Sequence, residues 1–221
     1  LIAPINCSFT FCGKFFFVFS LTIFLKSLIK PSQSFSSSSV SNNTPLGLDV
    51  STSITGVTVV DTSGRCVYNE FWDTRNKNKF PDLYAKAKHI QEMLWRIDDL
   101  HTILPGGVFI EQPFMFFNSG GSTAKTMAKL QRFNGMVSWL CCDIFGVQPE
   151  HLTAHESRKL VGIKIPRGEN AKLAVLDFIV DNEPAFDISY TKHGNPKPEC
   201  FDKADSLVVA RAGSEICSQR N

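Results

Sequence analysis

The chain has 221 residues, of which 43% are hydrophobic and 20% are charged, and its formal net charge is +2. This composition is ordinary for a globular protein, and the length is sufficient for one substantial core. The seven cysteines are odd in number and include no C-x-x-C pair, which argues against a disulfide framework and a zinc ribbon and favours a reducing compartment.

The first 45 residues differ in composition from the rest, because they contain no Asp or Glu. They contain three lysines and then the stretch "PSQSFSSSSV" (31–40), in which six of ten residues are Ser. An acid-free, basic and Ser-rich N-terminus is typical of an organelle transit peptide. We therefore predict a transit peptide over 1–45, with the chloroplast as its destination and the mitochondrion as the alternative.

The uncharged run "FFFVFSLTIFL" (15–25) offers a competing interpretation of the same region. It has 11 residues, whereas a helix that crosses a bilayer needs about 20, so it would suit the core of a secretory signal rather than a membrane anchor. The Ser-rich stretch after it and the unpaired cysteines favour transit over secretion. Without residues 1–45 the chain carries 20 basic and 21 acidic residues, so nucleic-acid binding would depend on a local patch and not on net charge.

From residue 46 the pattern of apolar residues predicts a single α/β domain that ends near residue 217, followed by a short tail (218–221). The order of the elements is that of a ribonuclease H-like fold, a mixed five-stranded sheet flanked by helices. It consists of three antiparallel strands, a helix, a parallel strand and then alternating helix and strand. The expected elements, in chain order, are strands at 46–51, 54–61 and 65–73, a helix at 80–101, a strand at 107–113, a helix at 122–145, a short strand near 150–154, helices near 155–161 and 169–181, and a last helix at 200–217.

Acidic residues occur at three places where the local pattern favours apolar ones. Asp49 lies inside the first strand, in "GLDVSTSITGVTVVD" (47–61), and Glu111 ends the fourth strand, in "VFIEQPF". Asp202 and Asp205 are three residues apart, so they share one face of the last helix. Burial of an unpaired carboxylate costs several kcal/mol, so each side chain needs a ligand. From Asp49 alone two ligands are open: a metal ion in a nuclease, or the phosphates of a nucleotide in a sugar-kinase-like enzyme.

If the first and fourth strands are neighbours, Asp49 and Glu111 lie about 5 Å apart across the ladder. Like charges at that distance repel and raise each other's pKa, and a hard divalent cation such as Mg²⁺ or Mn²⁺ removes the penalty. Two ions about 4 Å apart, held by all four acids, could activate a water and stabilise the leaving oxygen in phosphodiester hydrolysis. Single acids also have structural explanations, since a lone Asp often ends a strand and Asp202 could cap the last helix. Together, four acids on three elements favour a metal site.

Four segments of the chain are specific in combination, although each alone is weak: "LGLDVSTSITGVTVVD", "FIEQPFMFFNSGGSTAKTMAKLQRFNG", "RKLVGIKIPRGENAKLAVLDFI" and "FDKADSLVVARAG". With them the chain resembles the RuvC-type Holliday junction resolvases, and more closely the plant chloroplast members, the monokaryotic-chloroplast resolvases. The resemblance covers nearly all of 46–217. It implies a homodimer that nicks opposite strands of a four-way DNA junction symmetrically and leaves 5′-phosphates, using Mg²⁺ or Mn²⁺ and no nucleotide cofactor. The family's catalytic, metal-binding tetrad would fall on Asp49, Glu111, Asp202 and Asp205.

By the same resemblance, the aromatic residue that wedges the junction open falls on Phe114. Such a wedge costs a few kcal/mol of unstacking, which contacts to the opened junction offset. The next segment, "MFFNSGGS" (115–122), departs from bacterial members, which lack its double Phe and Gly pair. It resembles the base-reading loop of the chloroplast proteins, which favours cleavage between cytosines, although each Phe is equally compatible with a core position. The expected base contacts are stacking by Phe116 and Phe117 and hydrogen bonds from Asn118 and Ser119.

Basic residues form two groups that could neutralise DNA phosphates. One group recurs at helical spacing on one face of the expected helix at 122–145 and comprises Lys125, Lys129 and Arg132. The other lies in the second half of the chain and comprises Arg158, Lys159, Lys164, Arg167 and Lys172. Because most surface lysines are only solvated, each group carries more weight than any of its members. His193 precedes the last acidic pair and could assist the metal site, although a His in a loop is more often simply exposed.

Three other functions compete with junction resolution. A sugar kinase or actin-like ATPase has a similar first phosphate loop, but it needs two such domains and a second loop, and only about 175 residues remain here after the transit segment. A non-catalytic DNA-binding protein would not need all four acids. Another ribonuclease H-like nuclease, acting on RNA–DNA hybrids, would not need the wedge. The sequence therefore predicts a four-way junction endonuclease of organelle DNA recombination and nucleoid segregation.

Overall fold

The computed structural model describes residues 44–101, 103, 106–113 and 124–220. These residues belong to one unit, which spans 41–221. Residues 1–43 of the expected transit peptide lie outside the described residues. The expected wedge and base-reading segment also lies outside them, with Phe114, Phe116, Phe117, Asn118 and Ser119.

One sheet is formed by β1 (Leu46–Val50), β2 (Ile54–Val60), β3 (Cys66–Asp73), β4 (Val108–Glu111) and β5 (Glu150–Leu152). The strand order is β3-β2-β1-β4-β5. β1 pairs antiparallel with β2, and β2 with β3, whereas β4 runs parallel to both β1 and β5. This is the mixed five-stranded sheet expected from the sequence, and the fold prediction is confirmed.

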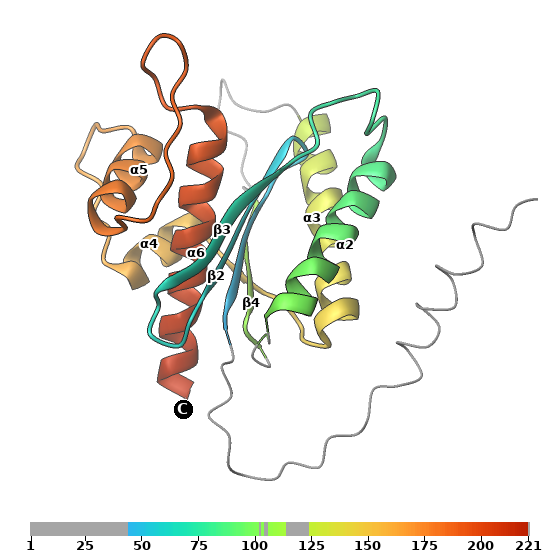
Figure 1. The fold of residues 1–221 in the computed structure, drawn as a ribbon, viewed down its shortest axis with the longest axis horizontal. Coiled ribbons are helices and arrows are strands. Elements are labelled where there is room, and N and C mark those ends of the chain that lie inside the picture. The colour runs from blue at the N-terminus through green and yellow to red at the C-terminus, as the bar shows by residue number, and fades with distance from the viewer. Residues whose placement is uncertain (1–43, 102, 104–105, 114–123, 221) are drawn as a thin grey trace, which may run out of the picture. The chain divides into compact units, whose positions relative to one another are not determined.

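The helices are α2 (Leu83–Leu100), α3 (Ala124–Phe145), α4 (Ala154–Val161), α5 (Ala171–Asn182) and α6 (Pro198–Arg220). α2 and α3 cover one face of the sheet, and α4, α5 and α6 lie on the other (Figure 1). α2 begins later than expected because Asp82 caps it, accepting a hydrogen bond from the backbone nitrogen of Ala85. α6 begins earlier than expected and includes residues 218–220, which the sequence analysis assigns to a tail.

The alternation of side chains along β1 and β4 determines which residues face α6. In β1, Leu48 belongs to the core beneath α2 and α3, so the adjacent Asp49 faces α6. In β4, Ile110 belongs to that same core, whereas Phe109 packs with residues of α6. Glu111 therefore faces α6 as well, and the two acids of the sheet point to the same side.

Two glycines let α6 lie close to the sheet. A Cβ atom at Gly56 of β2 would stand 1.9 Å from the carbonyl oxygen of Asp202, and one at Gly47 of β1 would stand 2.4 Å from the backbone nitrogen of Ala210. Real Cβ atoms essentially never approach within 3.0 Å of other atoms, so a larger residue at either position would push the helix away. This contact could not be predicted from the sequence, because a Gly inside a strand indicates that another segment comes close but does not indicate which segment it is.

No helix in the described part of the chain is long and apolar enough to cross a membrane. The described cysteines are free thiols, as expected for a chain without a disulfide framework. They are Cys66, Cys141, Cys142, Cys200 and Cys217.

Candidate active site

Asp49 and Glu111 lie next to each other at one edge of the sheet. β1 and β4 are parallel and pair through Leu48 and Ile110, and the two acids are the next residue in each strand. The carboxyl ends of parallel strands meet at one edge, and both side chains face α6. The expectation that the first and fourth strands are neighbours is confirmed.

α6 brings the other two acids to the same place. Asp202 lies in the second turn of the helix, so its role as a helix cap, one structural explanation offered by the sequence, is wrong. Its backbone carbonyl lies over Gly56, and Gly56 is the partner of Asp49 in the β1–β2 ladder. Asp205 follows three residues later, on the same face of the helix. The structure thus brings together all four acids that the sequence analysis selects.

Burial raises the pKa of every one of these acids, and the charges of neighbouring acids raise the pKa of Asp49, Glu111 and Asp202 further. Burial raises the pKa of Asp49 well above its ordinary value, and the charges of the other three acids raise it further. Burial, followed by the charge of Asp205, raises the pKa of Glu111 to about 7. Burial is also the main reason that the pKa of Asp202 rises to about 6 and that the pKa of Asp205 is raised. Perturbations of this kind concentrate at functional sites.

The charge of the cluster is partly balanced within the protein. Burial is the largest influence on the pKa of Asp202, but the charge of Lys172 and the side chain of Asp49 both act to lower it. The ammonium nitrogen of Lys172 lies 3.8 Å from Oδ2 of Asp205. Burial lowers the pKa of Lys172, but the acids outweigh this effect and hold its pKa above the ordinary value. Lys172 is therefore the counter-ion of the acid cluster.

The donor set of the cluster suits a hard divalent cation, because it consists of carboxylate oxygens alone. Within the described ranges, no group of three or more His, Cys, Asp or Glu side chains stands in an arrangement that could hold a metal ion. The chemistry of the donors therefore fits Mg²⁺ or Mn²⁺, but their present positions do not, so the side chains would have to move closer together to bind such an ion.

A basic groove of about 430 Å³ lies at α4 and the loop that follows it. It brings together three of the expected DNA-binding residues, Arg158, Lys159 and Lys164, with His155 at the same groove. Arg158 links the groove to the acids, because its positive charge lowers the pKa of Glu111 and of Asp205. Arg158 therefore lies close enough to the acid cluster for its charge to act there.

The remaining expected contacts lie elsewhere. Lys125, Lys129 and Arg132 are exposed on α3, across the sheet from the groove. His193 is exposed in the loop before α6, where its backbone nitrogen donates to Oγ1 of Thr191 at 3.4 Å. A role for His193 at the acid cluster therefore gains no support.

Comparison with known proteins identifies the fold. No protein-family model matches the chain, and no curated protein sequence matches it. RuvC of Thermus thermophilus in complex with a Holliday junction substrate matches with a TM-score of 0.54 at 15% identity, over 80% of this chain and 96% of that chain. A second structure of this RuvC matches with a TM-score of 0.54 at 17% identity and the same coverage. The yeast mitochondrial Holliday junction resolvase Ydc2 matches with a TM-score of 0.53 at 10% identity, over 83% and 82%.

The chain has the RuvC fold.

Two polar contacts of this RuvC-like fold were not predicted from the sequence. The ammonium group of Lys86 on α2, which is only 9% exposed, donates to the backbone carbonyl of Thr52 in the turn after β1. The amide nitrogen of Asn134 on α3, 4% exposed, donates to the backbone carbonyl of Glu111 at 3.3 Å. Both polar residues stand within the apolar stripe of their helix, which is the signal that the sequence offered.

Proposed function

We propose that the chain is a structure-specific endonuclease, a crossover junction endodeoxyribonuclease that resolves four-way (Holliday) DNA junctions by paired, metal-dependent nicks. The observation that carries the proposal is the meeting of Asp49, Glu111 and the two acids of α6 on one side of a RuvC-like sheet. Two resolvases share this fold, and one of them was crystallised with a Holliday junction, which supports the class of substrate.

The four acids would hold Mg²⁺ or Mn²⁺, with two ions in each site. Such ions supply an activated water and stabilise the oxygen that leaves phosphorus. Because carboxylates bind metal only when ionised, any proton on the four acids must leave when a cation binds. Lys172 would then be released from the acids, and its ammonium group would be in reach of a phosphate oxygen of the DNA. Hydrolysis breaks the bond from phosphorus to the 3′ oxygen and leaves a 5′-phosphate.

Two basic surfaces would bind the DNA backbone, with an affinity that falls as salt rises. The groove that contains Arg158 would bind the strand that is cut. The exposed first half of α3 would bind an arm of the junction, at the end of the α2–α3 groove that Arg132 lines. The residues involved would be Arg158, Lys159, Lys164 and Lys172 on one side, and Lys125, Lys129 and Arg132 on the other. Phe114 would wedge the junction open. Base reading, with a preference for cytosine-rich cleavage sites, would fall to Phe116, Phe117, Asn118 and Ser119.

We expect the protein to act as a homodimer, because a junction cut symmetrically at two points matches a protein with two-fold symmetry. A groove of about 540 Å³ between α2 and α3 supports this assembly. Two largely exposed aromatic residues line it, Tyr84 (75% exposed) and Trp139 (64% exposed). Exposed apolar surface of this kind marks interaction sites, and a second copy of the chain is the occupant we propose.

The cellular setting follows from the N-terminal composition. The acid-free, Ser-rich residues 1–45 support an organelle location, with the chloroplast nucleoid first and the mitochondrion as the alternative. The fold is shared with a mitochondrial resolvase, Ydc2, which supports an organelle without choosing between the two. Recombination and segregation of organelle DNA would be the processes served.

The test is cleavage of synthetic four-way junctions by the full chain with Mg²⁺ or Mn²⁺. We expect symmetric nicks, while a linear duplex and an RNA–DNA hybrid of the same sequence stay intact. Cleavage of the hybrid instead would assign a different ribonuclease H-like nuclease.

The matched variants of this test are two Asp→Asn substitutions. Asp49→Asn should lower the rate about 1,000-fold, in line with the several kcal/mol that metal ions supply. Asp181→Asn changes an exposed aspartate of α5 and should cut normally. Full cutting by Asp49→Asn would refute the metal assignment.

A further inference from the structure

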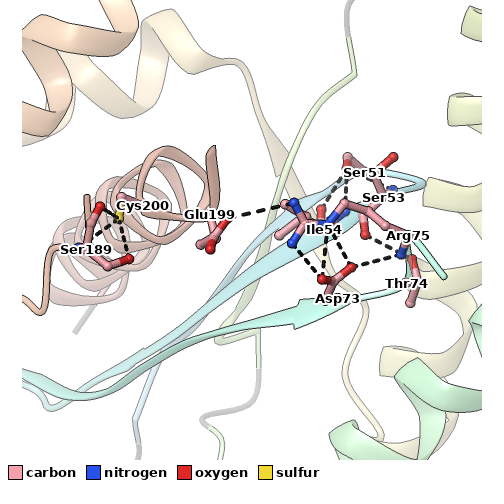
Figure 2. Close-up of polar contacts among 9 residues, drawn as sticks. All are labelled: Ser51, Ser53, Ile54, Asp73, Thr74, Arg75, Ser189, Glu199 and Cys200. Carbon is pink, nitrogen blue, oxygen red and sulfur yellow. Dashed lines mark hydrogen bonds and ion pairs between the residues drawn. The ribbon is translucent and has the colours of Figure 1, made fainter. Parts of the chain in front are cut away.

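A short segment at the end of β3 connects the sheet with α6, as Figure 2 shows for Asp73, Thr74 and Arg75. Asp73 is the last residue of β3, and it orients the guanidinium group of Arg75. Nε of Arg75 donates to both carboxylate oxygens at 3.0 Å, and Nη2 donates to Oδ2 at 2.6 Å. The backbone nitrogen of Arg75 donates to Oδ1 of Asp73 at 2.9 Å. The direction of the guanidinium group is therefore fixed, although the Arg75 side chain is 46% exposed.

The remaining guanidinium nitrogen of Arg75 points to the start of α6. Nη1 lies 3.8 Å from Oε2 of Glu199, whose side chain is only 12% exposed (Figure 2). Glu199 is in the first turn of α6 and stands three residues before Asp202, so the two acids share one face of the helix. Arg75 thus reaches from β3 to the helical turn that leads into the acid cluster. Cys200, the next residue, contacts Ser189 instead, within the segment that leads into the helix (Figure 2).

Thr74 holds the other side of the same segment. It is 1% exposed, and its backbone nitrogen and Oγ1 donate to the carbonyl of Ser53 at 2.8 and 3.2 Å. Its Oγ1 also lies 3.4 Å from the carbonyl oxygen of Thr52. These carbonyls belong to the turn between β1 and β2, because Thr52 and Ser53 follow Asp49 by three and four residues. Two adjacent residues of one segment therefore bind the turn beside Asp49 and the helical turn beside Asp202.

We propose that residues 73–75 form a clasp that fixes the spacing between β1 and the first turns of α6, with Arg75 as a positioning residue for the acid cluster. The proposal deepens the proposed function and rests on it for the identity of the ligand, a divalent cation. The need for a clasp is electrostatic, because the acids on β1, β4 and α6 repel one another and would drive α6 from the sheet. Supporting contacts of this kind around metal ligands are commonly worth a 10- to 100-fold change in affinity or activity.

The sign of the effect separates positioning from charge. Arg75→Gln removes a positive charge near the cluster, so charge alone predicts tighter binding of a cation. A clasp predicts weaker binding, because the ligands are no longer held together. We expect Arg75→Gln to weaken Mn²⁺ binding about tenfold, measured by calorimetric titration of the full chain. Arg75→Lys keeps the charge without the forked geometry, and its affinity should fall between those of wild type and Arg75→Gln.

The matched control is Arg220→Gln at the opposite end of α6. Arg220 is 55% exposed and pairs with Glu150 of β5 at 2.5 Å, so this variant also loses an exposed Arg–carboxylate pair. We expect it to bind Mn²⁺ like wild type. A second readout needs no metal: the backbone amides of residues 199–205 should exchange hydrogen faster in Arg75→Gln, and at the wild-type rate in Arg220→Gln.

Each outcome decides the matter. Mn²⁺ affinity of Arg75→Gln at or above the wild-type value overturns the clasp, and so does unchanged hydrogen exchange in residues 199–205. An equal loss in Arg220→Gln also overturns it, because the effect would then be general to such ion pairs. If wild type binds Mn²⁺ but leaves junctions uncut, while Arg75→Gln binds more weakly, the clasp stands and the proposed function fails.

Discussion

Gly56→Ala should disable the site through the position of α6. The added methyl group would stand 1.9 Å from the carbonyl oxygen of Asp202. Since 3.0 Å is the shortest approach that Cβ atoms show, the backbone at Asp202 must move by about 1 Å. Both atoms in conflict belong to backbone or to a Cβ, so no side-chain rotation relieves it. The movement separates Asp202 from Asp49, the ladder partner of Gly56.

The expected magnitudes follow from that displacement. Overpacking of a tight core contact typically costs about 1–3 kcal/mol, which lowers the melting temperature of a domain of this size by about 3–10 °C. A misplacement of about 1 Å in catalytic geometry can cost about 100-fold in rate. Cutting should therefore fall far more than the folded fraction does. Mn²⁺ affinity should fall as well, because Asp202 is one of the proposed ligands.

The assay compares Gly56→Ala with Gly213→Ala at a temperature where both variants are folded. A Cβ at Gly213 would meet the ring of Phe109 at 2.2 Å, so the same substitution strains the same helix. Gly213 lies eight residues beyond Asp205, about 12 Å along the helix axis. We expect a similar loss of melting temperature in both variants, with cutting by Gly213→Ala within about threefold of wild type. Equal loss of cutting in the two variants would refute the reasoning, as would normal cutting by Gly56→Ala.

Two further predictions concern protons and assembly. The pKa of Glu111 rises from 4.5 to about 7 on folding, so its contribution to stability is present below pH 4.5 and is lost as the pH rises through 7. With a chelator present to remove metal ions, the melting temperature should therefore fall between pH 5 and 8. Glu111→Gln should flatten this pH dependence, by up to about 3 kcal/mol of unfolding free energy for an isolated group with this shift. An unchanged pH profile in Glu111→Gln would contradict the assignment. Trp139→Glu should convert the dimer to a folded monomer, measured by light scattering. Tyr190→Glu changes another exposed aromatic residue (54% exposed) and should remain dimeric. A dimer in both variants would exclude the α2–α3 groove as the dimer interface.

Much of the site could be predicted from sequence because strands and helices have fixed periods. An acid at the end of an apolar strand must share a face with alternate residues, so Asp49 and Glu111 could be paired once the two strands were taken as neighbours. The spacing of Asp202 and Asp205 put both on one face of a helix. What periodicity could not supply was the start of α6. That start excludes Asp202 as a cap, because it lies four residues earlier, at Pro198.

Contacts between distant segments were beyond the sequence for a different reason. Arg75 is an ordinary surface residue type, and nothing in its neighbourhood distinguishes it from a solvated side chain. Lys86 stands in the apolar stripe of α2, but the sequence does not indicate which group it contacts. Their roles depend on which carbonyl or carboxylate the fold brings near, such as Glu199, which is 124 residues away from Arg75 in the chain. Gly56 was visible as a glycine in a strand, but its partner on α6 was not. The local sequence is thus enough to identify the four acids, but the distances between them depend on contacts between distant segments.

The spacing is maintained against repulsion by buried polar contacts beneath the middle of α6. Ser206 and Thr58 hydroxyls lie 2.8 Å apart, and the amide of Asn69 donates to the Thr58 hydroxyl at 2.7 Å and to the carbonyl of Lys203 at 3.0 Å. Leaving one such buried group without its partner costs about 1–3 kcal/mol. The network joins α6 to β2 and β3 between and beside Asp202 and Asp205, so it resists movement of the helix where the acids push. The fold therefore holds the acids together before any cation binds. The free energy of cation binding would then only have to draw the carboxylates the remaining distance toward the ion.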